Sequence, residues 1–238
     1  MLQIKKIEYR DGATVLEGYC AYDDTFRGKK PAVLISHDWS GRNEFAGKKA
    51  EKIAELGYVG FALDMYGKGK IGSTPEEKMM LMTPFMEDRA KLLKRISAAL
   101  DVVNKLEFVN PAKIGAIGFC FGGLCALDLA RSGADIKGVV SFHGLLSPST
   151  VKNNKPILAK VLALHGHDDP MGLPEQVLAF ENEMTEKGVD WQVHVYGNTK
   201  HAFTNPAAND TKLGLIYNNI AEKRSWVAMT NFFSEIFS

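Results

Sequence analysis

Apolar and polar positions alternate at the beginning of the chain. The alternation over residues 4–9 leads to an Asp11-Gly12 turn and resumes over residues 15–21. A period of two that is interrupted by an Asp-Gly pair is typical of two antiparallel strands joined by a tight turn. We therefore expect an N-terminal β-hairpin.

Beyond the hairpin, short apolar runs alternate with segments of helical spacing. The predicted strands cover residues 32–35, 58–63, 113–118, 138–142, 160–164 and 191–196. The predicted helices cover residues 43–56, 75–106, 121–131, 174–187 and 213–237. The helical segment 75–106 is expected to break near Pro84, because proline lacks the N–H and clashes with the preceding turn.

Repeated alternation of strands and helices predicts an α/β fold. It has a mostly parallel central sheet, helices on both faces and the N-terminal antiparallel hairpin. We find neither an internal repeat nor a linker, so residues 1–238 are predicted to form one domain.

Composition narrows the class of protein. Apolar residues make up 45% and charged residues 24% of the chain, which is typical of a globular protein. A formal net charge of +1 gives no electrostatic basis for binding nucleic acid or an anionic membrane. The N-terminus lacks the pattern of a signal peptide, and no apolar stretch approaches the roughly 18 residues of a membrane span. With three cysteines, this favours reduced thiols and a cytoplasmic location.

Cys120 lies in the segment Gly118-Phe119-Cys120-Phe121-Gly122-Gly123, between a predicted strand and a predicted helix. A turn this short forces its central residue into a strained backbone conformation, and the flanking glycines relieve crowding between strand and helix. The helix start places N–H groups and positive partial charge near the sulfur, which favours the thiolate. These features indicate a nucleophile; the alternative is a buried structural cysteine in a glycine-rich turn.

A thiol nucleophile needs a base, and the base needs an acid that orients it. Hydrolases of this type have the chain order nucleophile, acid, histidine. Asp169, in the loop 165–170 after a predicted strand, is the expected acid, and Asp168 in the same loop is the alternative. An aspartate there can also simply cap a turn. His201 follows the strand that ends at Tyr196, so it is the expected base.

The loop over residues 36–41 follows the first strand after the hairpin. In such hydrolases this loop supplies the second donor to the oxyanion. We expect the backbone N–H groups of Phe121 and of a residue near Trp39 to form the oxyanion hole. Asp38 either contacts the nucleophile or fixes its own loop by accepting backbone hydrogen bonds, and both interpretations stay open.

Three motifs together resemble the dienelactone hydrolase family over nearly the whole chain. They are the Gly-Phe-Cys-Phe-Gly-Gly turn, the loop His165-Gly166-His167-Asp168-Asp169-Pro170 and the run His201-Ala202-Phe203. The resemblance implies an α/β-hydrolase core, a Cys-Asp-His triad without a cofactor, and hydrolysis of lactones or esters. Position by position, it assigns Cys120 as the nucleophile, Asp169 as the acid and His201 as the base.

The chain departs from that family at the residues that bind the substrate. The member that gives the family its name has a glutamate that contacts the cysteine, where this chain has Asp38. It also holds the substrate carboxylate with two arginines. Here Thr204-Asn205 stands at one of these places, and the region 76–82 contains Lys78 but no arginine. Without this cationic clamp, the sequence argues against dienelactone itself as the substrate.

Four further histidines also follow predicted strands, namely His37, His143, His165 and His167. Their spacing fits no metal-binding motif, so we expect structural histidines bonded to the backbone and no metal site.

The sequence as a whole predicts a hydrolase that cleaves a small ester or lactone through an acyl-enzyme on Cys120. A thioesterase or an acyl transferase would use the same three residues. A non-catalytic ligand-binding protein would keep the fold with an unreactive thiol. A small molecule is the expected partner, and the protein is expected to be a monomer or a small homo-oligomer.

Overall fold

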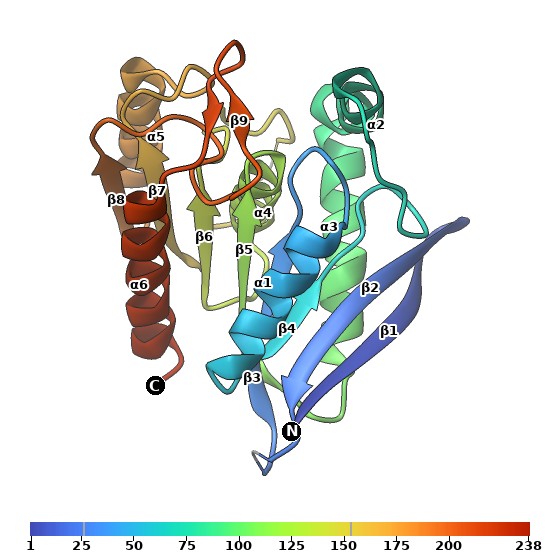
Figure 1. Cartoon of the computed structure of the whole chain (residues 1–238). Helices are drawn as coiled ribbons and strands as arrows, with labels where there is room; N and C mark the ends of the chain where they lie inside the picture. The colour runs from blue at the N-terminus through green and yellow to red at the C-terminus, as the bar shows by residue number, and fades with distance from the viewer. Residues whose placement is uncertain (26, 153) are drawn as a thin grey trace. The chain divides into compact units, whose positions relative to one another are not determined.

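The structure is a computed structural model that describes residues 1–25, 27–152 and 154–238. The chain forms two compact units, Met1–Ile117 and Gly118–Ser238. The single domain predicted for residues 1–238 stays a prediction. The main sheet has eight strands in the order β1-β2-β4-β3-β5-β6-β7-β8, and a second sheet has two short strands (Figure 1). The α/β-hydrolase class predicted from the sequence is confirmed, including the antiparallel hairpin and the mostly parallel sheet.

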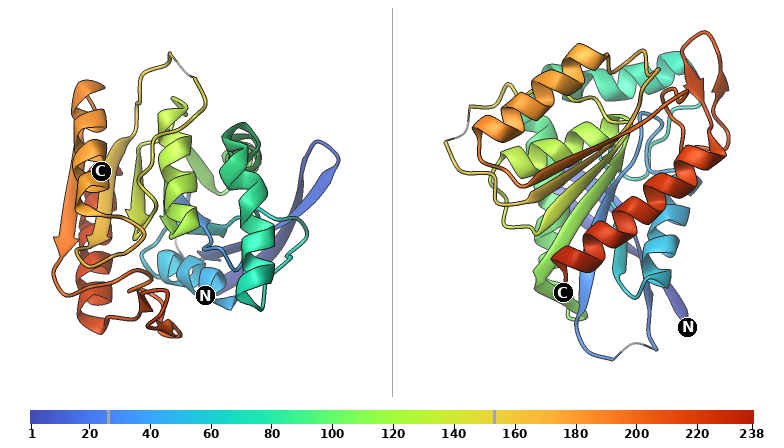
Figure 2. Two further views of the ribbon diagram at one scale, coloured as in Figure 1. Left: turned by 90° about the horizontal axis from the view of Figure 1, so that it is seen from above. Right: turned by 90° about the vertical axis from the view of Figure 1, so that its left-hand side faces the viewer.

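The first unit contains the hairpin and the first helices. Its elements are β1 (Leu2–Asp11), β2 (Thr14–Asp23), β3 (Lys30–Ser36), α1 (Glu44–Glu55), β4 (Val59–Ala62), α2 (Pro75–Glu87), α3 (Arg89–Asn104) and most of β5 (Val109–Phe119). β2 pairs antiparallel with both β1 and β4, whereas β3 and β4 are parallel. α1 packs on β2 and β4, and α3 packs on β1 and β3, so the two helices cover opposite faces (Figure 2).

The second unit contains the remaining parallel strands. Its elements are the end of β5, α4 (Phe121–Arg131), β6 (Gly138–Phe142), β7 (Lys160–Gly166), α5 (Pro174–Glu186), β8 (Trp191–Tyr196), β9 (Asn209–Asp210), β10 (Leu215–Ile216) and α6 (Asn219–Ile236). β7 is parallel to both β6 and β8. α4 packs on β6 and α5 on β8, while α6 packs on β6 and β7 from the other face (Figures 1 and 2).

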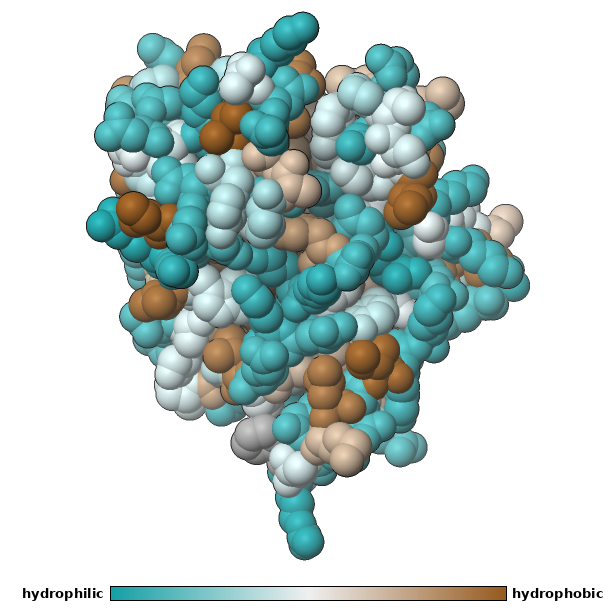
Figure 3. All heavy atoms as spheres, viewed as in Figure 1, coloured by the Kyte–Doolittle hydropathy of each residue, from teal (hydrophilic) through white to brown (hydrophobic). Residues whose placement is uncertain are grey.

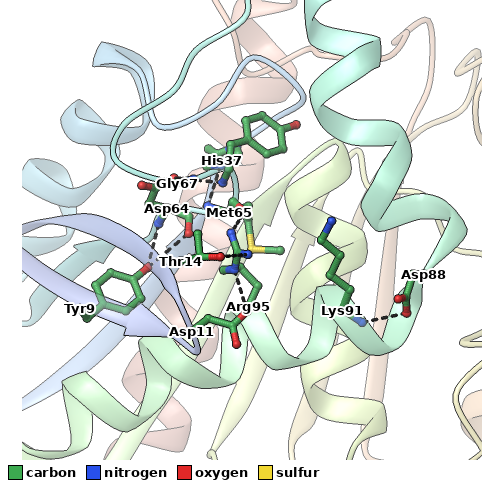
Figure 4. A network of polar contacts seen from close by, with 11 residues as sticks. Tyr9, Asp11, Thr14, His37, Asp64, Met65, Gly67, Asp88, Lys91 and Arg95 are labelled. Atoms are coloured by element: carbon green, nitrogen blue, oxygen red, sulfur yellow. Dashed lines mark hydrogen bonds and ion pairs between the residues drawn. The ribbon is translucent and has the colours of Figure 1, made fainter.

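The long helical segment breaks in two near Pro84 as predicted, but Pro84 itself lies inside α2. The break falls at Asp88, whose backbone leaves the helical region at φ −119° and ψ 89°. Its Oδ1 accepts a hydrogen bond from the N–H of Lys91 at 2.9 Å and so caps α3 (Figure 4). Proline removes one N–H from a helix, whereas a capping aspartate provides the start of a new one.

The predicted start of the terminal helix is wrong. The segment 213–218 precedes α6, and its apolar pair Leu215 and Ile216 forms β10, which pairs with β9. Asn218 then caps α6 by accepting hydrogen bonds from the N–H groups of Ile220 and Ala221, both at 3.1 Å. The apolar residues of β10 happen to match the helical spacing of α6, so the sequence extends the helix too far. Strands of two residues are too short to show an alternation of their own.

Asp64 organises the loop that follows β4 and is fully buried, with 0% of its surface exposed. Its Oδ1 accepts hydrogen bonds from the N–H groups of Tyr66 at 3.0 Å and Gly67 at 2.9 Å. Its Oδ2 accepts hydrogen bonds from the N–H groups of Glu17 at 3.1 Å and Gly69 at 2.9 Å. Four backbone N–H groups thus satisfy a buried carboxylate, which ties the loop to the hairpin.

Arg95 of α3 makes a second polar connection beside Asp64 (Figure 4). Its Nε donates to Asp11 at 2.9 Å, and its Nη1 donates to the carbonyl oxygen of Met65 at 2.7 Å. The guanidinium is nearly completely buried, so it links the helix, the hairpin turn and the loop after β4 within the first unit.

Among the described residues, no helix is both long enough and apolar enough to cross a membrane. On the face shown in Figure 3, hydrophobic residues form small separate patches on a largely hydrophilic surface.

We predict that Asp64→Ala lowers the free energy of unfolding by about 3 to 5 kcal/mol, because buried N–H groups lose their acceptor. Equilibrium unfolding in urea measures this change. The matched control is Asp101→Ala, at an exposed aspartate of α3, which should change the free energy by less than about 0.5 kcal/mol. Equal effects of the two substitutions would contradict the role assigned to Asp64.

Candidate active site

Cys120 lies at the junction of β5 and α4 and has a strained backbone, with φ 55° and ψ −118°. Positive φ values are uncommon for residues other than glycine and gather at functional sites. The N–H of Cys120 donates to the carbonyl oxygen of Phe142 at 3.0 Å. The side chain is half-buried, whereas Cys20 and Cys125 are buried, and all three are free thiols.

The glycines around Cys120 are required by space. A Cβ on Gly118 would lie 1.8 Å from the carbonyl oxygen of Gly122, and a Cβ on Gly123 would lie 2.5 Å from Oγ of Ser141. The end of the strand therefore touches the first turn of α4 backbone to backbone. Only this close approach allows the chain to turn from strand to helix within one residue.

Asp169 and His201 form a buried pair in the same unit as Cys120. Nδ1 of His201 lies 2.7 Å from Oδ2 of Asp169, and both side chains are about 1% exposed. The other carboxylate oxygen, Oδ1, accepts a hydrogen bond from the N–H of Met171 at 2.8 Å. Asp168 is exposed, and its backbone N–H donates to the carbonyl oxygen of Thr199. Of the two candidate acids, the residue in contact with His201 is Asp169.

The surroundings of His201 favour its charged form. Burial by itself lowers the pKa of this imidazole. The negative charge of a Cys120 thiolate and the hydrogen bond with Asp169 outweigh burial, and they raise the pKa to about 10. Nε2 of His201 is buried and forms no hydrogen bond of good geometry with the described residues. The Cys120 thiolate nevertheless raises this pKa both by its charge and as a nearby hydrogen-bond acceptor. Such long contacts are common in catalytic pairs without substrate.

The loop of His201 is held by β10. The N–H of Ile216 donates to the carbonyl oxygen of His201 at 2.9 Å. The next residue, Ala202, has φ 59°, a second positive value in a residue other than glycine. The short β9–β10 sheet, which the sequence did not predict, therefore supports the candidate base directly.

Asp38 and Trp39 lie in the first unit, in the loop after β3. Oδ1 of Asp38 accepts a hydrogen bond from the N–H of Ser40 at 2.8 Å, so it fixes its own loop, one of the two roles expected for it. Tyr66 donates its hydroxyl proton to the carbonyl oxygen of Trp39 at 2.9 Å. Nζ of Lys78 lies 5.4 Å from the centre of the Trp39 ring. A contact between Asp38 and the nucleophile stays a prediction.

Two of the remaining histidines, His37 and His165, contact the backbone, and the described residues contain no group of three or more His, Cys, Asp or Glu side chains that could hold a metal ion. His37 contacts the carbonyl oxygen of Asp38 through Nδ1 at 2.6 Å, and His165 contacts that of Gly172 through Nε2 at 2.7 Å. Burial lowers the pKa of both imidazoles, in agreement with neutral rings bonded to the backbone.

His143 contacts both the Cys120 turn and the His201 loop, although the sequence marks it only as a structural histidine. It directly follows β6, and its Nδ1 lies 3.2 Å from the backbone nitrogen of Cys120. The signal available in the sequence was its place at the carboxyl end of a parallel strand, where ligands and catalytic groups gather in α/β proteins. A lone histidine at such a place carries too little information to be singled out.

Comparison with known proteins identifies the family. The profile of the dienelactone hydrolase family matches residues 16–237. The chain belongs to the dienelactone hydrolase family. It is accordingly a hydrolase of carboxylic esters or lactones.

Individual relatives agree with this membership. An Aquifex aeolicus protein named as a carboxymethylenebutenolidase is 28% identical over 232 residues, which cover 95% of this chain and 96% of that protein. A Bradyrhizobium protein named as a 2-oxo-3-(5-oxofuran-2-ylidene)propanoate lactonase is 28% identical over 186 residues, or 74% of each chain. The crystal structure of the dienelactone hydrolase-like promiscuous phosphotriesterase P91, from metagenomic libraries, is 38% identical. It covers 99% of this chain and 98% of its own, with a TM-score of 0.94.

We predict that Gly118→Ala disrupts the turn from β5 into α4 at residues 118–123 (the elbow), because the added Cβ would overlap the carbonyl oxygen of Gly122. We expect a loss of about 3 kcal/mol in the free energy of unfolding and of about 100-fold in kcat for a chromogenic short ester. Gly197→Ala is the control, since its Cβ would meet nothing within 4 Å. An elbow variant as stable and active as this control would disprove the steric argument.

We also predict that Cys120→Ala lowers the pKa of His201 by about 1 to 3 pH units, because the thiolate charge is removed. In the intact protein the stabilisation from the charged imidazole is fully present below about pH 6.5 and is lost as the pH rises to about 10. Titration of the histidine resonances by NMR measures both values. The exposed His194 on β8 should titrate alike in both proteins, and an unchanged His201 would refute the pairing with Cys120.

Proposed function

We propose that this dienelactone hydrolase family member cleaves a small ester or lactone with a triad of Cys120, His201 and Asp169. The observation that carries the proposal is the buried His201–Asp169 contact of 2.7 Å, beside a cysteine held at a strained strand–helix turn. The raised pKa of His201 supports a thiolate–imidazolium pair, the reactive form of a cysteine nucleophile.

In the proposed reaction, the Cys120 thiolate attacks the carbonyl carbon and forms a tetrahedral intermediate. The N–H of Phe121, at the start of α4, and an N–H near Trp39 are proposed to stabilise its oxyanion. The His201 imidazolium gives its Nε2 proton to the leaving alkoxide, which leaves a thioester on Cys120. Neutral His201 then takes a proton from water, and the resulting hydroxide releases the acid product.

Asp169 has a fixed task in both steps. Its Oδ2 accepts the Nδ1 proton of His201, so that Nε2 remains the nitrogen that exchanges a proton with substrate and water. Its Oδ1 is held by the N–H of Met171, which prevents the carboxylate from turning away. The carboxylate also stabilises the imidazolium that the thiolate requires.

The residues at the two arginine positions of the family's founding member favour a substrate without a carboxylate. Thr204 stands at the first of these positions, where it is buried and hydrogen-bonded to His143. The region 76–82, which holds the second position, has Lys78, whose Nζ lies 5.4 Å from the centre of the Trp39 ring. A neutral small ester or lactone therefore fits better than dienelactone.

We propose a cytoplasmic location, which the three free thiols support.

The substrates to be tested include a phosphotriester. The reason is that P91, which is 38% identical to this chain, is named as a phosphotriesterase.

The triad is tested by Cys120→Ala and by the pair Asp169→Asn and Asp168→Asn. We expect Cys120→Ala to lose at least about 10⁴-fold in kcat/KM for a short p-nitrophenyl ester, and Asp169→Asn about 10² to 10⁴-fold. Asp168→Asn should stay within about threefold, because its exposed side chain has no part in the triad.

Full turnover by Cys120→Ala would overturn the proposal. A panel of lactones, oxygen esters, thioesters and a phosphotriester then defines the substrate class, with Cys120→Ser for comparison. Preference for thioesters would favour a thioesterase or acyl transferase. A thiol that resists iodoacetamide, together with no turnover of any substrate, would favour a ligand-binding protein.

A further inference from the structure

We propose that His143 is a positioning residue that couples the Cys120 elbow to the loop carrying His201. The inference rests on the proposed triad, which it deepens. It is drawn from contacts within the second unit.

His143 has an unusual backbone for its residue type. Its φ is 39°, and its N–H donates to the carbonyl oxygen of Leu164 at 2.8 Å, so the strained residue is anchored on β7. The side chain is only 2% exposed. Strain of this kind persists where surrounding structure holds it, and it gathers at functional sites.

The hydrogen bonds of His143 define its tautomer. The backbone N–H of Cys120 is a donor, so Nδ1 of His143, at 3.2 Å, accepts and carries no proton. Nε2 then carries the proton and donates it to Oγ1 of Thr204 at 2.8 Å. His143 is therefore neutral, and each of its two nitrogens holds a different part of the proposed site.

The two partners of His143 belong to the nucleophile turn and the base loop. Cys120 shares its N–H between Nδ1 of His143 and the carbonyl oxygen of Phe142 at 3.0 Å. Thr204 lies three residues after His201 and is buried. The bridge Cys120–His143–Thr204 thus connects the nucleophile's backbone to the loop of the base by a path that does not pass through the sulfur.

Ring packing reinforces the same connection. The His143 ring packs edge-on against His201, with centroids 5.1 Å apart, and against Phe203, with centroids 5.0 Å apart. Phe203 in turn packs edge-on against Tyr196 of β8. An apolar residue of similar size would supply this packing without the hydrogen bonds to Cys120 and Thr204. The experiment must therefore remove these two hydrogen bonds and keep the packing.

Two substitutions separate the two hydrogen bonds. In His143→Asn, the amide oxygen can reach the place of Nδ1 and keep the Cys120 contact, and asparagine tolerates a positive φ. In His143→Gln, the longer amide can reach the place of Nε2 and keep the Thr204 contact. We expect each variant to lose about tenfold in kcat with KM changed less than about twofold, because one hydrogen bond is missing.

A double-mutant cycle with Thr204→Val distinguishes the bridge from general damage. Thr204→Val should have no further effect on His143→Asn, in which the contact to Thr204 is already lost. It should also leave kcat of His143→Gln nearly unchanged, because the bridge is already broken at Cys120 in that variant, whereas two independent contacts would give about another tenfold loss. Thr204→Ser should recover most of the kcat lost in Thr204→Val. If the His143 variants do not fold, this Thr204 pair decides alone.

The pH dependence of iodoacetamide labelling gives a readout that needs no ester turnover. Of the three thiols, only that of Cys120 is partly exposed. Loss of labelling in Cys120→Ala verifies that the label reports this thiol. We expect the labelling midpoint to rise by at least about half a pH unit in His143→Asn, which loses the contact to Thr204, because a displaced His201 stabilises the thiolate less. His194→Asn, at an exposed residue of β8, is the matched control.

Folded variants with unchanged kcat and an unmoved labelling midpoint would overturn the inference, as would additive effects of Thr204→Val and His143→Asn. A lower thermal midpoint without either change would show a purely structural role. The proposed triad fails separately, through turnover by Cys120→Ala, so the two failures are distinguishable.

Discussion

The turn from β5 into α4 is the constraint on which the candidate site depends. Gly118 and Gly122 touch backbone to backbone, and Cys120 takes up the whole change of direction at φ 55°. This strain is offset by α4, which is buried along its entire length and cannot shift without disturbing its packing. The candidate nucleophile is therefore held by the core of the unit and not by a flexible loop.

Two of the buried carboxylates, those of Asp64 and Asp169, are stabilised in different ways. Asp64 accepts hydrogen bonds from four backbone N–H groups, which hold a loop in one shape. Asp169 uses one oxygen for a backbone N–H and offers the other to an imidazole that can gain or lose a proton. The first arrangement suits a permanent structural anchor, and the second suits chemistry, because the charge of its partner can change during a reaction.

Local sequence predicted the elements that have strong local signals. The elbow around Cys120, the hairpin and most helix limits follow from glycine spacing, alternation and capping residues. The break was expected near Pro84 but lies at Asp88, because proline is the stronger signal in a sequence. In the structure α2 accommodates Pro84, and Asp88 caps the start of α3.

The rest depends on contacts between distant residues. The order of Cys120, Asp169 and His201 could be read from the chain, but only the structure separates Asp169 from Asp168 by burial and contact. The β9–β10 sheet and the place of His143 result from pairing with the His201 loop, which leaves no periodic trace in the sequence.

The uneven exposure of the three sulfurs has a consequence for the handling of this protein. An oxidant in solution meets Cys120 first, because Cys20 and Cys125 are buried. Neither buried thiol is available at the surface to resolve a sulfenic acid as an internal disulfide, so recovery relies on an external reductant. The same exposure that would let a substrate reach the candidate nucleophile also lets peroxide reach it.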